Sequence, residues 1–188
     1  MADPRTRLLD VPPDYDELLA RAAELPWAVK PDWQGVGGRL VGWPIQLAAW
    51  LRFPPAVKYM TVYTTILFGW IYLRVGRQGP PTDGTRAHEA VHDWQGDRYF
   101  AHGLRVSLDP RGVNLPWLRT KVSWRGHTEA MAYALNVVRG ELTTTEAVQR
   151  LTKPAYATGL TRGLAFDLVA AYVTKLRREC RGVPLPEK

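Results

Sequence analysis

Two histidines and a glutamate stand together in the stretch His88-Glu89-Ala90-Val91-His92. If this stretch is helical, the four-residue spacing puts both imidazoles on one face, one turn apart. Two ligands of a tetrahedral metal ion require that geometry. Glu89, next to the first histidine, then reaches a metal-bound water without being a ligand itself. The pattern predicts a Zn²⁺ site in which Glu89 is the general base for the attacking water.

The expected site needs a third protein ligand, because catalytic zinc sites usually keep three and leave one position for water. We favour Glu129, since it lies early in an otherwise apolar helical stretch, where a buried carboxylate needs a partner. His102 is the next candidate, ten residues after the motif and across an expected loop. The remaining candidates are Asp93 and Asp97.

The residues that follow the motif exclude one class of zinc site. A metzincin would have a glycine three residues after His92 and a histidine six residues after it, but Gln95 and Arg98 occupy those positions. Gln95 lies on the same helical face as His92. There it can hydrogen-bond a metal ligand or a backbone group, and a surface position is the alternative.

Two further side chains are candidates for catalysis. Tyr133 follows Glu129 by one helical turn and could donate a hydrogen bond to the oxyanion of a tetrahedral intermediate. His127 could act as an electrophile in the same way. The alternatives are a core tyrosine and a residue at the start of a helix.

The segment from His88 to Gln95, followed by Glu129-Ala130-Met131-Ala132-Tyr133, resembles the small single-domain gluzincin-type zinc metallopeptidases. It is most similar to predicted bacterial and phage-associated peptidases with an HExxHxxQ helix and a later Glu-x-x-Ala helix. The resemblance covers about residues 57–140. It implies a strand beside the cleft, a motif helix and a glutamate helix, with zinc held by His88, His92 and Glu129 and with Glu89 as the base.

The chain departs from the thermolysin-type pattern, because it has neither an Asn-Ala-x-Tyr edge strand nor a Glu-x-x-x-Asp glutamate helix. A weaker resemblance links His92 and His102-Gly103 to the three-histidine SprT-like zinc proteases. The metal-binding pattern is therefore more specific than the pattern for catalysis.

Capping residues and apolar spacing predict helix, then strands, then helices, which is an α+β order. Residues 27–44 are rich in Gly, Pro and Trp and are expected to form an ordered surface loop. Gly69 is expected in a turn or bulge between strands. The expected strands are 57–66 and 67–75. The expected helices are 15–24, 45–51, a motif helix ending at 95 before Gly96, 122–139, a short helix after Thr143, and 160–181.

This order predicts an α+β fold with a minimal zincin-like core, formed by a short β-sheet, the motif helix and the glutamate helix, with helical extensions at both ends. Residues 1–56 would form a helical, Trp-rich N-terminal extension, and residues 57–188 the metallopeptidase domain with its C-terminal helices. The strand around 59–65 could offer an edge to an extended peptide.

Composition limits the other functional classes. The 188 residues carry 25 Lys+Arg against 18 Asp+Glu, so the net charge is +7, and 19 of the cations are arginines. They are spread along the chain, which argues against nucleic-acid binding. A single cysteine, Cys180, excludes an intramolecular disulfide framework. We expect no signal peptide, no membrane span, and a location in the cytoplasm or in a larger particle.

The sequence therefore predicts a zinc metallopeptidase that hydrolyses an amide bond in a peptide or protein. The alternative is a zincin-fold component of a phage particle or secretion machine, bound to other chains and with little or no catalysis. The identity of the substrate is beyond the sequence.

Overall fold

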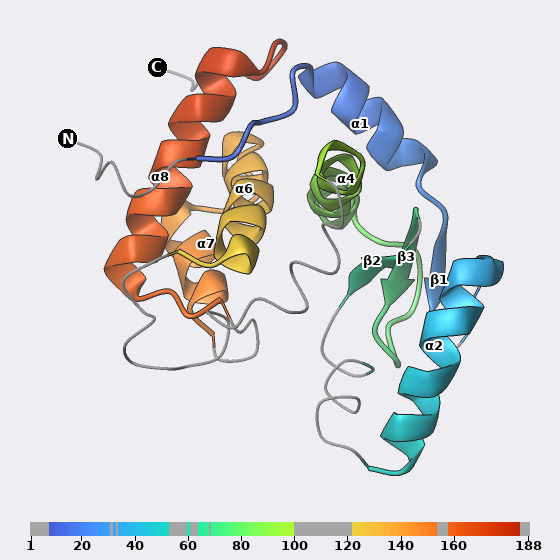
Figure 1. The fold of residues 1–188 in the computed structure, drawn as a ribbon. Helices are drawn as coiled ribbons and strands as arrows, with labels where there is room; N and C mark the ends of the chain where they lie inside the picture. Colours follow the sequence, from blue (N-terminus) through green and yellow to red (C-terminus); the bar gives the residue numbers. More distant parts are fainter. Residues whose placement is uncertain are drawn as a thin grey trace.

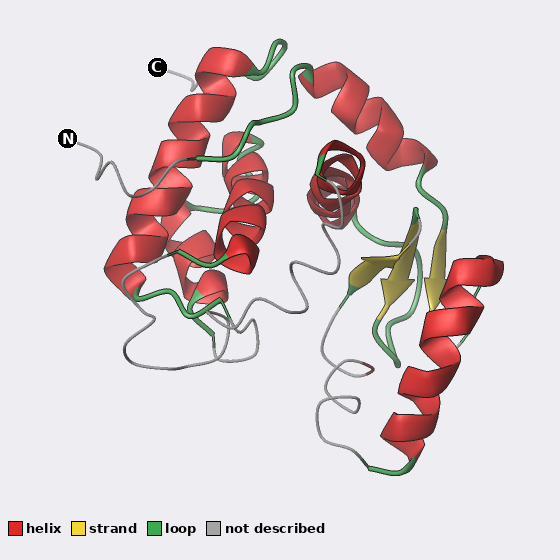
Figure 2. Cartoon of the chain, in the orientation of Figure 1, coloured by secondary structure: helices red, strands yellow, loops and turns green. Residues whose placement is uncertain are grey.

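The computed structural model describes residues 8–30, 32, 34–52, 60, 64–67, 69–99, 122–153 and 158–184. In these residues the chain forms six helices and one small mixed sheet, which confirms the expected α+β class (Figures 1 and 2). The elements in chain order are α1 (Tyr15–Glu24), β1 (Trp27–Val29), α2 (Gly35–Trp50), β2 (Thr65–Leu67), β3 (Trp70–Leu73), α4 (Asp83–Arg98), α6 (Trp124–Val138), α7 (Thr144–Leu151) and α8 (Arg162–Glu179).

The sheet has the strand order β1-β3-β2, with β1 parallel and β2 antiparallel to the central strand β3. Gly69, at φ 74°, makes the turn between β2 and β3, as the sequence predicts. Successive residues of a strand point to opposite faces of the sheet. Ile71 and Leu73 accordingly join the main core, while Tyr72 joins a smaller cluster with Ala28.

Helix α6 is the centre of the main core. It packs against α4, α7 and α8, and α1 packs against the outer side of α4 (Figure 1). The six residues from Ala130 to Leu135 are at most 3% exposed, so this stretch of the helix is enclosed on every side. Such burial explains why the helix is almost entirely apolar from Ala130 onward.

Side-chain caps fix where several helices begin. The Asp14 carboxylate accepts hydrogen bonds from the backbone N–H groups of Asp16 and Glu17 and so starts α1. Thr82 starts α4 in the same way. Thr143 and Glu146 form the expected capping box of α7, with each side chain bonded to the backbone of the other.

Two arginines hold α1 on the motif helix. Arg86 of α4 donates to the carbonyl of Leu25 at 2.8 Å, where the last carbonyls of α1 have no partner within their helix. In the reverse direction, Arg21 of α1 binds Asp93 and Asp97 of α4, with ion-pair distances of 2.5 Å. Helix α1 thus covers the side of α4 that carries the two aspartates.

The expectation for residues 27–44 was wrong. Part of this stretch forms β1, because residues 27–29 pair in register with 71–73 of β3. The helix expected at 45–51 starts ten residues earlier, at Gly35, and continues through Pro44. Helix α2 forms despite the low helix propensity of its glycines, and Ile45 packs against the smaller cluster of the sheet.

Other boundaries also differ. Helix α4 does not stop at Gln95 but continues past Gly96 to Arg98. Of the expected strand 57–66, Thr65 and Ile66 are the described residues that form a strand. Leu67 belongs to β2 rather than to the second strand, and Met60 is helical. The expected domain boundary at residue 56 lies outside the described residues. Both β1 and α1, which precede it, pack on elements that follow it.

No helix among the described residues is long and apolar enough to cross a membrane.

Candidate metal centre

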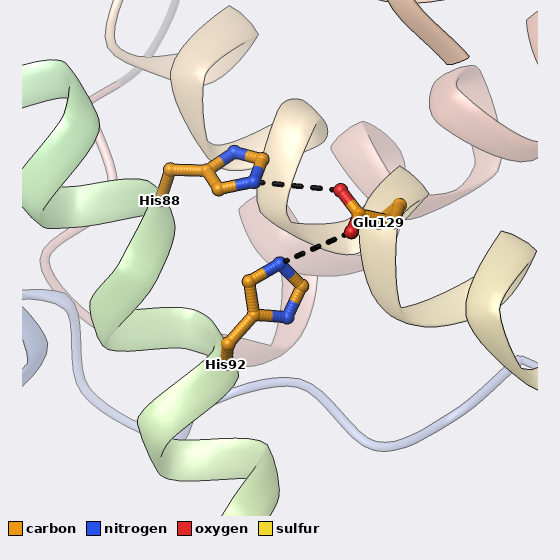
Figure 3. A group of neighbouring side chains, drawn as sticks. All are labelled: His88, His92 and Glu129. Carbon is orange, nitrogen blue, oxygen red and sulfur yellow. Dashed lines mark ion pairs between the residues drawn. The ribbon is translucent and has the colours of Figure 1, made fainter. Parts of the chain in front are cut away.

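Helices α4 and α6 bring the three expected ligands together. His88 and His92 project from one face of α4 toward Glu129 in the second turn of α6 (Figure 3). Their ligand atoms all lie within 4.8 Å of one another. The side chains are 13–19% exposed, so the group sits below the surface and still reaches solvent.

The distances suit a small tetrahedral ion. The Nε2 atom of His88 lies 3.5 Å from Oε2 of Glu129, and Nε2 of His92 lies 3.8 Å from Oε1 (Figure 3). Bonds of about 2.0–2.1 Å around a tetrahedral Zn²⁺ put neighbouring ligand atoms about 3.3 Å apart. Oε2 of Glu129 is buried and has no hydrogen-bond partner among the described residues. A buried carboxylate oxygen in this position fits a metal ligand, so the three residues suit the ion that the sequence implies.

The charges of Glu129 and the two histidines affect one another strongly. Burial alone would lower the pKa of His92, but the Glu129 carboxylate outweighs burial and raises that pKa to about 9. Burial acts in the opposite direction on Glu129, and the neighbouring imidazoles hold the pKa of its carboxyl well below the ordinary value. Without a metal, therefore, His92 and Glu129 form an ion pair at neutral pH.

Carboxamides orient both imidazoles. Nδ1 of His92 lies 2.9 Å from Oε1 of Gln95, and Nδ1 of His88 lies 3.2 Å from Oδ1 of Asn136. The nitrogens of both amides are already used as donors, by Gln95 to the Thr128 carbonyl at 3.3 Å and by Asn136 to the Gly84 carbonyl at 3.0 Å. The amide oxygens are therefore acceptors, which puts a proton on each Nδ1 and leaves each Nε2 able to bind a metal.

The role expected of Gln95 is present in the structure, whereas Asn136 was not predicted. Asn136 lies seven residues after Glu129, which is two helical turns along the same face of α6. That spacing places Asn136 on the same face as Glu129, but it does not by itself select an amide as a partner of His88. Its amide nitrogen also donates to Oε2 of Glu141 at 2.6 Å, so the orientation of His88 depends on residues beyond the end of α6.

Gly84 leaves room for the Glu141 carboxylate beside α4, since a Cβ atom on Gly84 would overlap that carboxylate. Gly84 lies one turn before His88 in α4. The hydrogen bond from Asn136 to its backbone carbonyl therefore links α4 and α6 next to the converging side chains.

Glu89 lies beside His88 in α4 and is only 5% exposed, and its charge interacts with those of His88, His92 and Glu129. Burial raises the pKa of its carboxyl, which makes Glu89 a stronger base. Lys30, which follows β1, is 1% exposed, and burial lowers the pKa of its ammonium to about 7 while the charge of Glu89 opposes that shift. Lys30 was missed at the sequence level, since a lone lysine after an irregular stretch carries no spacing signal.

The two other expected catalytic residues have different surroundings. The ring of Tyr133 packs edge-on against His88, with centroids 4.6 Å apart, and the residue is 3% exposed. His127 lies two residues before Glu129 and so on the opposite side of α6. Its Nδ1 is 2.9 Å from the hydroxyl of Tyr172 on α8. A catalytic role for either residue stays a prediction, and the contact with Tyr172 gives His127 a structural role.

Two of the three alternative third ligands, Asp93 and Asp97, are not brought into the group. Asp93 and Asp97 bind Arg21 instead, and His102 lies outside the described residues. Three apolar residues of the motif helix, Ala87, Ala90 and Val91, are fully buried in the main core.

No family model, curated protein or solved structure matches the chain.

Proposed function

We propose that the protein is a zinc-dependent metallopeptidase of gluzincin type, with Zn²⁺ held by His88, His92 and Glu129. One observation carries the proposal. Two imidazole Nε2 atoms, each oriented by an amide oxygen on Nδ1, converge on a buried carboxylate at 3.5 and 3.8 Å. An ion pair on a protein surface does not need this outer layer of oriented amides, whereas a metal site does.

A bound zinc ion would lower the pKa of a coordinated water to about 7 and polarise the substrate carbonyl. Glu89 would accept the proton of the attacking water and pass it to the leaving amine nitrogen. The raised pKa of its buried carboxyl supports this role, because the group can hold a proton between the two transfers. The His88–His92–Glu129 frame would keep the ion in place, and Tyr133 would keep the ring of His88 in position.

The sheet offers a way to hold an extended substrate. Strand β2 is at the edge of the sheet and contacts α4, and its outer edge has no partner strand among the described residues. A peptide that added to this edge would lie beside the motif helix, and its carbonyl groups would be bound through the backbone rather than through side chains. We therefore infer a peptide or protein substrate.

Metal content tests the site. Purified wild-type protein should contain one zinc per chain by mass spectrometry of the metal, and Glu129→Ala should lose it. His127→Ala is the matched control, because it removes a histidine from the same helix but outside the group, and it should keep the zinc. Wild-type protein that binds no stoichiometric zinc would overturn the proposal.

Cleavage tests the chemistry. Glu89→Gln removes the base but not a ligand, so it should keep its zinc and lose activity on a peptide library by roughly 10²- to 10⁴-fold. If wild type and Glu89→Gln both bind zinc, and neither cleaves any peptide, catalysis is excluded. That result would support the alternative hypothesis, in which the protein is a zinc-bearing component of a larger assembly.

A further inference from the structure

Helix α2 exposes large apolar side chains along one face. The residues are Leu40, Trp43, Leu47, Trp50 and the adjacent Leu51, which are 58–77% exposed. Their spacing of three, four and three residues places them within an arc of about 100° around the helix. We call these five residues the α2 apolar face. An exposed apolar surface of this kind marks an interaction site.

The opposite side of α2 is already occupied. Ile45 packs with Ala28, Met60 and Tyr72 on the face of the sheet that is turned away from α4. Figure 1 shows α2 on the outer side of the sheet, with α4 on the other side. The α2 apolar face is therefore directed away from the sheet, and a partner would reach it from outside without disturbing the core.

Charge selects the kind of partner. Between Asp32 and Asp83 the chain has no acidic residue and five cations, namely Arg39, Arg52, Lys58, Arg74 and Arg77. Arg39 immediately precedes the α2 apolar face and Arg52 immediately follows it, and both are exposed. A second copy of the chain would bring like charges together, which is unfavourable. A surface with dispersed negative charge meets both the cations and the apolar side chains.

We propose that the α2 apolar face docks onto an anionic lipid membrane, with the helix lying in the plane of the surface. Trp43 and Trp50 have the amphipathic ring that favours the headgroup level of a bilayer. The three leucines would enter the boundary of the acyl chains. Arg39 and Arg52, one at each end, would bind lipid phosphates and carboxylates. The inference does not rest on the proposed peptidase activity.

Vesicle co-sedimentation of the full chain tests the proposal. Vesicles of phosphatidylcholine with about 30% phosphatidylserine should bind the protein at least tenfold more tightly than vesicles of pure phosphatidylcholine. Binding should weaken when the salt is raised from 0.1 to 0.5 M, because the Debye length falls below the separation of the charges. Tryptophan emission should shift to shorter wavelength on binding.

Substitutions test whether vesicle binding depends on the α2 apolar face or on exposed apolar residues in general. Trp43→Ser/Trp50→Ser should weaken binding to the anionic vesicles more than tenfold, since each indole contributes a large apolar area. Arg39→Gln/Arg52→Gln should weaken it several-fold and reduce the salt dependence. Phe166→Ser is the matched control, because Phe166 is 50% exposed on α8, and it should bind like wild type.

Three results would overturn the proposal. One is absence of binding to the anionic vesicles, and another is equal loss of binding in Phe166→Ser. The third is concentration-dependent dimerisation in the ultracentrifuge that Trp43→Ser/Trp50→Ser abolishes, without vesicle binding, which would make the face a contact between copies. Circular dichroism of each variant confirms that it folds.

Discussion

The face of the sheet that carries Ile71 and Leu73 lies beneath α4 and belongs to the main core, whereas the face that carries Trp70 and Tyr72 lies beneath α2 and belongs to a cluster of only a few residues. On the α4 side, polar groups are buried and bonded to one another. On the α2 side, large apolar groups are exposed.

The difference lies in which partner each helix has within the chain. Helix α4 is enclosed by α1, α6 and the sheet, so its polar side chains must be paired inside the protein. Among the described residues, helix α2 packs only on the sheet and its small cluster, and its other side is exposed to water or to a partner. The first side has the requirements of a chemical site, and the second those of a docking surface.

Removing apolar volume from each side should give the largest contrast. Ile71→Ala creates a cavity at a fully buried position of β3 and should lower the free energy of unfolding by about 2–5 kcal/mol. Leu40→Ala, at a position 72% exposed, should change it by about 0.5 kcal/mol or less. Urea denaturation measures both. Similar losses in the two variants would mean that the α2 apolar face is packed in solution.

Lys30 tests whether the buried charge beneath α4 costs stability. Its pKa is about 7 in the folded protein against 10.5 in the unfolded chain, so the unfolded state binds more protons between these values and stability should rise with pH across that window. Compared with Glu89→Gln alone, Glu89→Gln/Lys30→Met should be more stable by about 1–4 kcal/mol at pH 7, with the difference shrinking toward pH 10.5.

Glu89→Gln/Lys153→Met is the control for this comparison, since Lys153 is exposed. Its stability should follow that of Glu89→Gln at every pH in the urea titrations. If the two double variants differ in stability by the same amount at every pH, the effect of Lys30→Met comes from packing and not from charge.

Loss of one orienting amide should weaken the metal site without removing a ligand. Gln95→Met keeps the volume but removes the acceptor for Nδ1 of His92, so zinc affinity should fall about 10- to 100-fold by competition with a chelator. Gln78→Met, at an exposed position, should have wild-type affinity. Equal affinities in the two variants would remove the argument that the amides orient the imidazoles.

The smallest expected effect is the dependence of zinc affinity on pH. Because the pKa of His92 is about 9 without metal, this imidazole is protonated at pH 7 and must lose its proton to bind zinc. Zinc affinity should therefore rise about tenfold from pH 7 to pH 8. Calorimetry in two buffers of different ionisation enthalpy should show about one proton released per zinc. No release at pH 7 would show that the His92–Glu129 ion pair does not form.

The motif side of the molecule was largely predictable from the sequence. His88, His92 and Glu129 could be placed because α-helical geometry converts their spacing into direction, and the capping residues mark helix starts locally. Asn136 obeys the same rule, but two turns of separation and the choice of an amide gave no chemical reason to select it. The contacts of Asp93 and Asp97 with Arg21 depend on how α1 lies across α4, and no local pattern predicts that.

The α2 side was predicted poorly, for a related reason. Residues 27–29 form a strand by pairing with β3, and α2 runs through several glycines and Pro44, which local propensity disfavours. Both are cases in which tertiary contacts outweigh local propensity. The tryptophans were noted as a group, but only the helix shows that Trp43 and Trp50 share one exposed face with leucines.

Gly84 connects a surface carboxylate to the orientation of one imidazole. A Cβ atom at this position would overlap the carboxylate of Glu141, so that carboxylate would have to shift. The same carboxylate accepts a hydrogen bond from the amide nitrogen of Asn136, whose Oδ1 lies beside Nδ1 of His88. A substitution in the first turn of α4 would therefore reach His88 through two side chains of the segment that contains Glu129, without touching any of the three converging residues.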